Sequence, residues 1–61
     1  MTAGELIRYL KKRGIEFKYH GAKHDAYWNP GTGSIAQIPR HPSQELKKGT
    51  QEKILRDLGL K

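Results

Sequence analysis

The fold is decided by residues 15–28, IEFKYHGAKHDAYW, where the spacing of apolar side chains changes from that of a helix to that of a strand. The first half of this stretch alternates apolar with polar residues, which is typical of a half-buried strand. The apolar set is Ile15, Phe17 and Tyr19, and the polar set is Glu16, Lys18 and His20. Gly21 and Ala22 supply a turn, and residues 24–28 supply a second strand. The stretch therefore predicts an antiparallel hairpin.

The segment before the hairpin is predicted to be a helix, because its apolar residues recur with a period of about 3.6 residues. These residues are Ala3, Leu6, Ile7 and Leu10. Thr2 and Glu5 have the spacing of a capping box at the helix start. Gly14 follows three cations and can adopt the left-handed conformation that ends a helix.

The segment after the hairpin begins with a dense turn at residues 29–33, NPGTG, which predicts a connection to a third strand at residues 34–38. Pro39 and Pro42 end that strand, since two prolines so close do not fit a central strand. The faces of the second and third strands stay open at this point. In a regular strand Tyr27 would face the side opposite to Ala26 and Trp28. Ile35 and Ile38 are three residues apart, so they would face opposite sides of the third strand.

The last part of the chain is predicted to contain a short helical turn at residues 43–48 and a closing helix capped by Thr50. Glu52 is expected in the first turn of that helix, and Gly59 at its end. Its apolar stripe consists of Ile54, Leu55 and Leu58.

These elements predict an α+β fold with the order α-β-β-β-α, in which two helices pack on one face of a three-stranded antiparallel sheet. This layout is that of the double-stranded RNA-binding domain class. At 61 residues the chain accommodates one domain, spanning residues 1–61.

The composition indicates an anionic partner. The chain has 12 Lys or Arg against 6 Asp or Glu, a net charge of +6, which favours nucleic acid over a membrane surface. It has no Cys, which excludes a disulfide scaffold and a cysteine-type zinc site and fits the reducing cytoplasm. No stretch approaches the roughly 18 apolar residues of a membrane span, so we expect no membrane association.

His24 is the best-placed candidate for proton transfer, because an unperturbed imidazole has a pKa of about 6.5. It follows a small-residue turn, and Lys23 beside it supplies a cation for a phosphate. His20 lies four residues before His24, a spacing that suits a metal only on a helix, so we interpret both as surface imidazoles flanking a turn and expect no metal site. Residues 31–33 lack the Lys-Ser or Lys-Thr of a phosphate loop and form part of a hairpin instead.

Aromatic and basic residues indicate a nucleic-acid surface. Tyr27 and Trp28 are interleaved with cations and are suited to stack on bases, although a single Trp in so small a chain is equally expected in the core. His41 is open to either a nucleic-acid contact or a packing role. The residues expected to bind nucleic acid are Lys23, Tyr27, Arg40, Lys47 and Lys48.

Several exact strings carry a resemblance to a known family. They are Gly21-x-x-His24, Tyr27, Asn29-Pro30-Gly31-Thr32-Gly33, Ile38-Pro39-Arg40-His41, Glu45-Leu46-Lys47-Lys48-Gly49-Thr50, Ile54-Leu55 and Leu58-Gly59-Leu60. Nearly end to end, the chain resembles the HicA toxins of bacterial and archaeal HicAB toxin–antitoxin systems, also called YcfA-like proteins. Members commonly spell the turn Gly-Ser-His, whereas this sequence has Ala22-Lys23 before His24.

The resemblance implies an mRNA interferase with a fold like a double-stranded RNA-binding domain, held inactive by a HicB antitoxin. We expect no cofactor, because RNA carries its own nucleophile. His24 matches the family's catalytic histidine. In the mechanism we hypothesise, His24 removes the proton of a ribose 2′-hydroxyl, while Lys23, Tyr27 or water serves as its acid–base partner. Two alternatives stay open: a non-catalytic RNA-binding module, and a basic face that docks an acidic protein partner.

Overall fold

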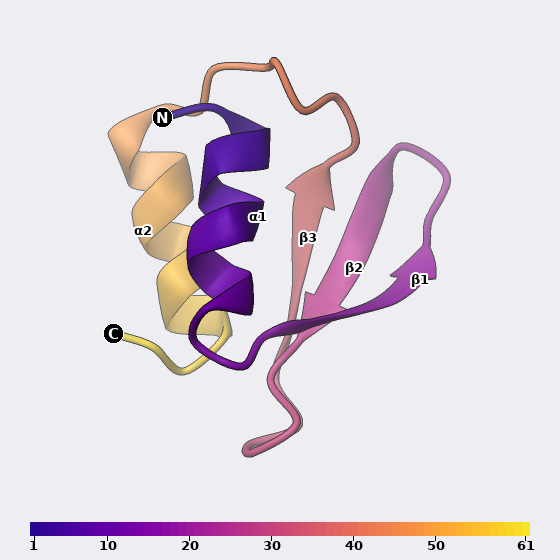
Figure 1. Ribbon diagram of the computed structural model, residues 1–61, viewed down its shortest axis with the longest axis vertical. Helices are drawn as coiled ribbons and strands as arrows, with labels where there is room; N and C mark the ends of the chain where they lie inside the picture. The colour runs from indigo at the N-terminus through magenta and orange to yellow at the C-terminus, as the bar shows by residue number, and fades with distance from the viewer.

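Five elements follow one another in the computed structural model, which describes all residues, 1–61. They are α1 (Ala3–Lys11), β1 (Glu16–His20), β2 (His24–Trp28), β3 (Ile35–Pro39) and α2 (Lys48–Asp57). The strands pair antiparallel in the order β1-β2-β3, and both helices lie on the same side of the sheet (Figure 1). The predicted α+β fold and its α-β-β-β-α order are confirmed. Neither helix is long and apolar enough to cross a membrane.

The start of α1 is the capping box that the sequence predicts. Thr2 Oγ1 accepts a hydrogen bond from the Glu5 amide at 3.2 Å, and Glu5 Oε1 accepts one from the Thr2 amide at 2.8 Å. These bonds with Thr2 lower the pKa of the Glu5 carboxyl. At the other end, Gly14 has φ +85°, the left-handed conformation expected after a helix. Both ends of α1 are therefore fixed by local sequence.

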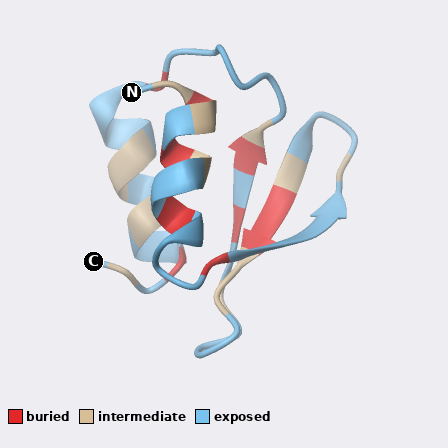
Figure 2. Cartoon of the chain, in the orientation of Figure 1, coloured by how far each residue is buried: buried red, intermediate tan, exposed pale blue.

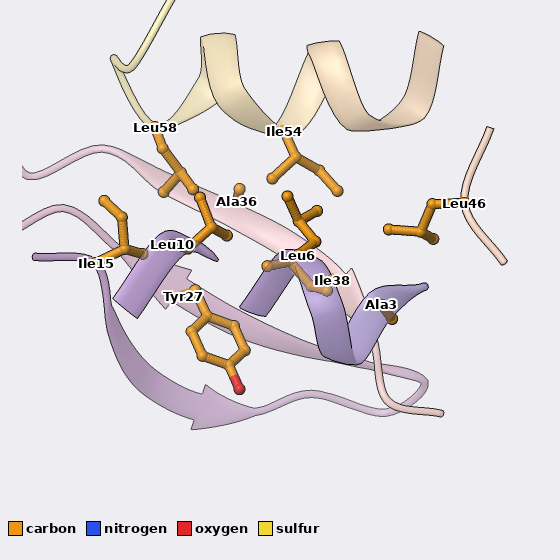
Figure 3. Close-up of a cluster of buried hydrophobic side chains, with 10 residues drawn as sticks. All are labelled: Ala3, Leu6, Leu10, Ile15, Tyr27, Ala36, Ile38, Leu46, Ile54 and Leu58. Carbon is orange, nitrogen blue, oxygen red and sulfur yellow. The ribbon is translucent and has the colours of Figure 1, made fainter. Parts of the chain in front are cut away.

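The core lies between the two helices and the covered face of the sheet (Figure 3). Ten buried residues form it, including one from the segment between β3 and α2. They are Ala3, Leu6, Leu10, Ile15, Tyr27, Ala36, Ile38, Leu46, Ile54 and Leu58.

Residues 44–47, between β3 and α2, are extended where we predicted a helical turn, and only residues 42 and 43 before them form a turn. Their backbone pairs with the N-terminus: the Ala3 amide donates to Gln44 O and the Leu46 amide to Met1 O, both at 2.9 Å. Leu46 is 5% exposed and packs in the core. The helical turn at residues 43–48 is therefore wrong, because these long-range bonds hold the backbone extended.

The closing helix begins earlier than predicted. α2 starts at Lys48 with Lys47 as its N-cap, and no side chain caps it, so Thr50 lies inside the helix and Glu52 beyond its first turn. The Gln51 side chain donates to Leu46 O at 2.9 Å. The buried Leu46 thus determines where α2 begins, and the helix starts before Thr50, the residue predicted to cap it. The predicted end at Gly59 is confirmed by its φ of +74°.

β1 is an edge strand that the helices leave uncovered (Figure 2). All five of its residues are exposed, including Phe17 at 42% and Tyr19 at 48%, whereas Ile15 just before it is buried. The register shifts between Phe17 and Tyr19, which pair with Tyr27 and Ala26 in turn. The expectation of a half-buried strand with one apolar face is wrong, because this bulge places Phe17 and Tyr19 on opposite faces.

The turn before β3 is confirmed and is tied to α2. Asn29 donates from Nδ2 to Leu58 O at 2.9 Å, and its Oδ1 accepts from the Gly31 amide at 2.9 Å. β3 begins at Ile35, one residue later than predicted, and includes Pro39, which is tolerated because β3 is an edge strand.

Strand register assigns the two faces that the sequence leaves open. Tyr27 pairs with Ala36, and both belong to the core, so this set faces the helices. Ala26 is fully buried yet lies outside the core cluster, because it points to the other side of the sheet. The residues of β2 and β3 on that side, which we call the open face, are His24, Ala26, Trp28, Ile35, Gln37 and Pro39.

Candidate functional site

His24 lies at the first position of β2, directly after the turn of residues 21–23. Its imidazole is exposed and takes part in none of the side-chain hydrogen bonds or ion pairs of the molecule. Its backbone is fixed, because His24 O accepts a hydrogen bond from the Gly21 amide at 2.8 Å. The arrangement is a free imidazole on an ordered backbone, which suits proton transfer to a bound substrate.

Gly21 is required in this turn by close approach. A Cβ added at Gly21 would lie 2.6 Å from His24 O, a backbone atom that cannot move aside without opening the turn. The glycine of the Gly21-x-x-His24 motif is therefore needed to position the histidine, because only a residue without a side chain lets the backbone of His24 approach so closely.

Arg40 holds the turn from outside the hairpin. Its Nε donates to Asp25 Oδ1 at 3.1 Å, and its Nη2 donates to Gly21 O. The Arg40 side chain is 43% exposed. Arg40, predicted as a nucleic-acid contact, thus joins the end of β3 to the turn that carries His24.

His20 completes this cluster. Its Nδ1 lies 2.8 Å from Asp25 Oδ1, and since an ionised carboxylate only accepts, the ring nitrogen donates. The Asp25 side chain is only 14% exposed. The hydrogen bond from His20, followed by the contact with Arg40, lowers the pKa of the Asp25 carboxyl. His20 is a surface imidazole beside the turn, as predicted, with its side chain 70% exposed. It also forms a clamp, which we define as His20, Asp25 and Arg40.

Asp25 and His20 are site residues that the sequence analysis missed. They are cross-strand partners in β1 and β2, so the hairpin register is the signal that pairs them. Because His24 alternates with Asp25 along β2, the clamp and the His24 side chain lie on opposite faces of the sheet.

Tyr27 lies in the core, which contradicts the expectation that its ring stacks on a base. It is 7% exposed, its ring packs edge-on to Phe17 with centroids 5.7 Å apart, and its hydroxyl points away from the cluster (Figure 3). Burial raises the pKa of that hydroxyl, and the negative charge of Asp25 acts in the same direction. The strand alternation also places Tyr27 on the face opposite His24.

Trp28 lies on the open face together with His24 and is half-buried. Lys18 Nζ lies 4.0 Å from the centroid of its ring, a cation–π contact between β1 and β2. Of the two aromatic residues predicted to contact bases, the structure therefore places one in the core and one on the surface.

The predicted basic residues divide into two groups. Lys23 is exposed in the turn beside His24. Lys47 and Lys48 are exposed at the start of α2, and His41 is exposed in the segment before it. Figure 1 shows the hairpin turn, this segment and the start of α2 toward the same end of the molecule. No hydrogen bond or ion pair joins the lysines of α2 to the turn.

Comparison with known proteins identifies a matching family over nearly the whole chain. Residues 3–60 match the model of a family described as the HicA toxin of bacterial toxin–antitoxin systems. A protein named probable mRNA interferase HicA 1, from Photorhabdus laumondii subsp. laumondii, is 38% identical over 60 residues, which cover 98% of this chain and all of the relative. The probable mRNA interferase HicA of Pseudomonas fluorescens is 31% identical over 61 residues, which cover all of this chain and 98% of the relative.

A solved structure is similar as well. One chain in the crystal structure of the E. coli HicAB toxin–antitoxin complex matches with a TM-score of 0.83 and 30% sequence identity. The match covers 97% of this chain and 98% of that chain.

Proposed function

The chain belongs to the HicA toxin family of bacterial toxin–antitoxin systems, and we propose that it is an mRNA interferase that cleaves RNA with His24 and is neutralised by a HicB-type antitoxin. The names of its relatives support the ribonuclease activity. The observation that carries the role of His24 is the free, exposed imidazole on the turn that Gly21 and the clamp hold in place. We expect this activity in the cytoplasm, where an mRNA substrate is found.

In the proposed reaction His24 acts as the general base. Its imidazole takes the proton of a ribose 2′-hydroxyl, and the 2′-oxygen forms a bond to the adjacent phosphorus as the bond to the 5′-oxygen breaks. The products are a 2′,3′-cyclic phosphate and a 5′-hydroxyl. The nucleophile belongs to the substrate, so this reaction needs no metal. Acid–base assistance of this kind contributes about 10²- to 10⁴-fold to a rate.

The leaving 5′-oxygen needs a proton that a single histidine does not provide in the same step. Tyr27 is a poor donor, because it lies on the opposite face of the sheet and burial raises the pKa of its hydroxyl. Lys23 is exposed in the turn directly before His24 and is the nearest cation in sequence. Lys23 therefore stabilises charge on the phosphoryl oxygens, and Lys23 or water supplies the proton.

A HicB-type antitoxin neutralises the activity by covering His24. The similarity to a chain of a toxin–antitoxin complex supports this pairing. The net charge of +6 suits an acidic protein surface as well as RNA, so an antitoxin that occupies the same basic surface excludes the substrate.

The role of His24 is tested by cleavage of a labelled single-stranded RNA in EDTA by the wild-type protein and by His24→Ala. We expect the substitution to reduce the cleavage rate by about 10²-fold or more while RNA binding is retained. His41→Ala is the matched control, since His41 is also an exposed histidine but lies outside the turn. Undiminished cleavage by His24→Ala would contradict the proposal, and RNA binding without cleavage by the wild type would indicate a binding module instead.

A further inference from the structure

The open face of the sheet carries more than His24. Neither helix covers it (Figure 1). The side chains of Ile35, which is 41% exposed, Gln37 and Trp28 all reach the surface there. His24 and Trp28 flank the small residue Ala26 along β2, so about 13 Å of strand separates their Cα atoms. The molecule encloses no pocket, so a ligand of this face lies across its surface.

The bulge in β1 adds two residues to this face. The register pairs Tyr19 with Ala26, so Tyr19 shares the side of the sheet with Ala26, and its side chain is 48% exposed. Lys18 reaches the same side, because its ammonium lies over the Trp28 ring. A regular strand would place adjacent residues on opposite faces, so the irregularity is what gathers a cation and a second aromatic ring here.

The contact between Lys18 and Trp28 suits exchange for a nucleobase. A cation–π contact at an exposed site is weak, so a base displaces the ammonium from the ring face at little cost. The displaced ammonium remains close and is then free to meet a backbone phosphate. One aromatic ring and one cation thus serve a base and its phosphate together.

We propose that single-stranded RNA lies across the open face, with a base stacked on Trp28 and the strand continuing over Tyr19 toward His24. The proposal rests on the function proposed above and adds the surface that holds the substrate. It favours RNA over a protein occupant because the face is continuous with His24, which a substrate must reach, and carries Lys18 with Lys23 at its border. Unpaired bases expose the π-faces that stack on such rings, whereas bases in a duplex do not.

The chain has a single Trp, so its fluorescence reports directly on this surface. The probe is a labelled single-stranded RNA of mixed sequence, added to His24→Ala so that binding is measured without cleavage. We expect quenching of the Trp28 emission on binding. In the same background Trp28→Ala should weaken affinity by about 5- to 150-fold, the usual effect of removing one stacking aromatic residue, and Trp28→Phe should restore most of it.

Two further variants separate stacking from loss of fold. Tyr19→Ala removes an exposed side chain and is expected to weaken binding while leaving the thermal melt unchanged. Tyr9→Ala is the matched control: Tyr9 is 38% exposed and carries Arg13 at 4.3 Å from its ring centroid, but it lies on α1. RNA affinity should be unchanged in this variant.

The outcomes distinguish this inference from the proposed function. If Trp28→Ala and Tyr19→Ala bind RNA as tightly as their parent and the emission is unchanged, RNA lies elsewhere and the inference is wrong, even where the wild type cleaves. If the emission responds to a HicB-type antitoxin and not to RNA, the open face belongs to the antitoxin and the inference is again wrong. Absence of any RNA binding by the parent contradicts both.

Discussion

At the scale of single residues, Asp25 is the carboxylate that links the three residues of the clamp. One of its carboxylate oxygens accepts from His20 and from Arg40, and Arg40 in turn donates to Gly21 O. The clamp therefore joins all three strands at the end of the sheet where His24 lies. We interpret it as the support that fixes the turn, on the face opposite to the one where chemistry is proposed.

The clamp makes stability depend on pH. The pKa of Asp25 is lower in the folded protein than in the unfolded chain, so its ionised form stabilises the fold above the ordinary carboxyl pKa. This contribution is lost as the pH falls through the lowered value. We expect Asp25→Asn to reduce the denaturant midpoint at pH 7. The substitution should have little effect once the pH is below the pKa of Asp25 in both the folded and the unfolded protein. Equal losses at neutral and strongly acidic pH would show that the charge of Asp25 is unimportant.

Gly21 gives a second prediction at this scale. Gly21→Ala places a Cβ 2.6 Å from His24 O, and backbone distortion of this kind costs about 1–3 kcal/mol. We expect lower stability together with slower RNA cleavage, because the displaced backbone carries His24. The matched control is Gly49→Ala, where a new Cβ meets nothing within 4 Å. Denaturant unfolding and the cleavage assay should both separate the two variants, and equal behaviour would contradict the steric argument.

At the scale of elements, the N-terminus of α2 is less well stabilised than that of α1, which has a capping box. Two cations stand at the N-terminus of α2, where the helix dipole disfavours them, and no side chain caps the free amides. A structural role does not explain Lys47 and Lys48 in these positions. An anionic ligand at this end of the molecule, such as the phosphates of bound RNA, would account for them.

This weakness predicts that Lys47→Asp stabilises the fold, by about 1 kcal/mol, because the new carboxylate both caps the helix and complements its dipole. The same change is expected to weaken RNA binding, since it replaces a cation with an anion. The two readouts are the denaturant midpoint and the affinity for labelled RNA. The matched control is Lys47→Ala, which removes the cation without supplying a cap, so it should weaken RNA binding without the same gain in stability. Reduced stability with unchanged binding in Lys47→Asp would contradict the interpretation.

Features that depend on neighbouring residues were predicted correctly from the sequence. Features that depend on contacts between distant parts of the chain were not. The capping box of α1 and the final glycine of α2 involve neighbours in the chain, and both are confirmed. The start of α2 depends on Leu46 in the core, and the exposure of β1 depends on how far the helices extend over the sheet. Neither the start of α2 nor the exposure of β1 can be predicted from a window of a few neighbouring residues.

The candidate site shows the same division. Lys23 lies in the turn and His24 directly after it, where the hairpin pattern places them. Tyr27 and Trp28 are adjacent aromatic residues that the sequence did not tell apart, because only the strand register shows which one faces the core. The pairing of His20 with Asp25 also depends on register, and the bulge at Lys18 moved part of β1 out of its regular phase.

At the scale of the whole molecule, the fold divides into a covered face that supplies stability and an open face that is available for RNA. Both helices contribute to the core on one side, whereas His24, Trp28 and the two residues gathered by the bulge lie on the other. The open face of this 61-residue chain is small and includes His24, so a partner that covers this face would cover His24 as well. This arrangement fits a toxin whose substrate and antitoxin compete.

The most direct test of the central claim, that His24 and the substrate's own 2′-hydroxyl cleave RNA, is product analysis with the purified wild-type protein. An RNA that it cleaves at a mapped bond is compared with the same RNA carrying a single 2′-deoxy nucleotide on the 5′ side of that bond. The account predicts 2′,3′-cyclic phosphate and 5′-hydroxyl ends from the first substrate and no cleavage at that bond in the second. Cleavage at the modified bond, or products with 5′-phosphate ends, would contradict it.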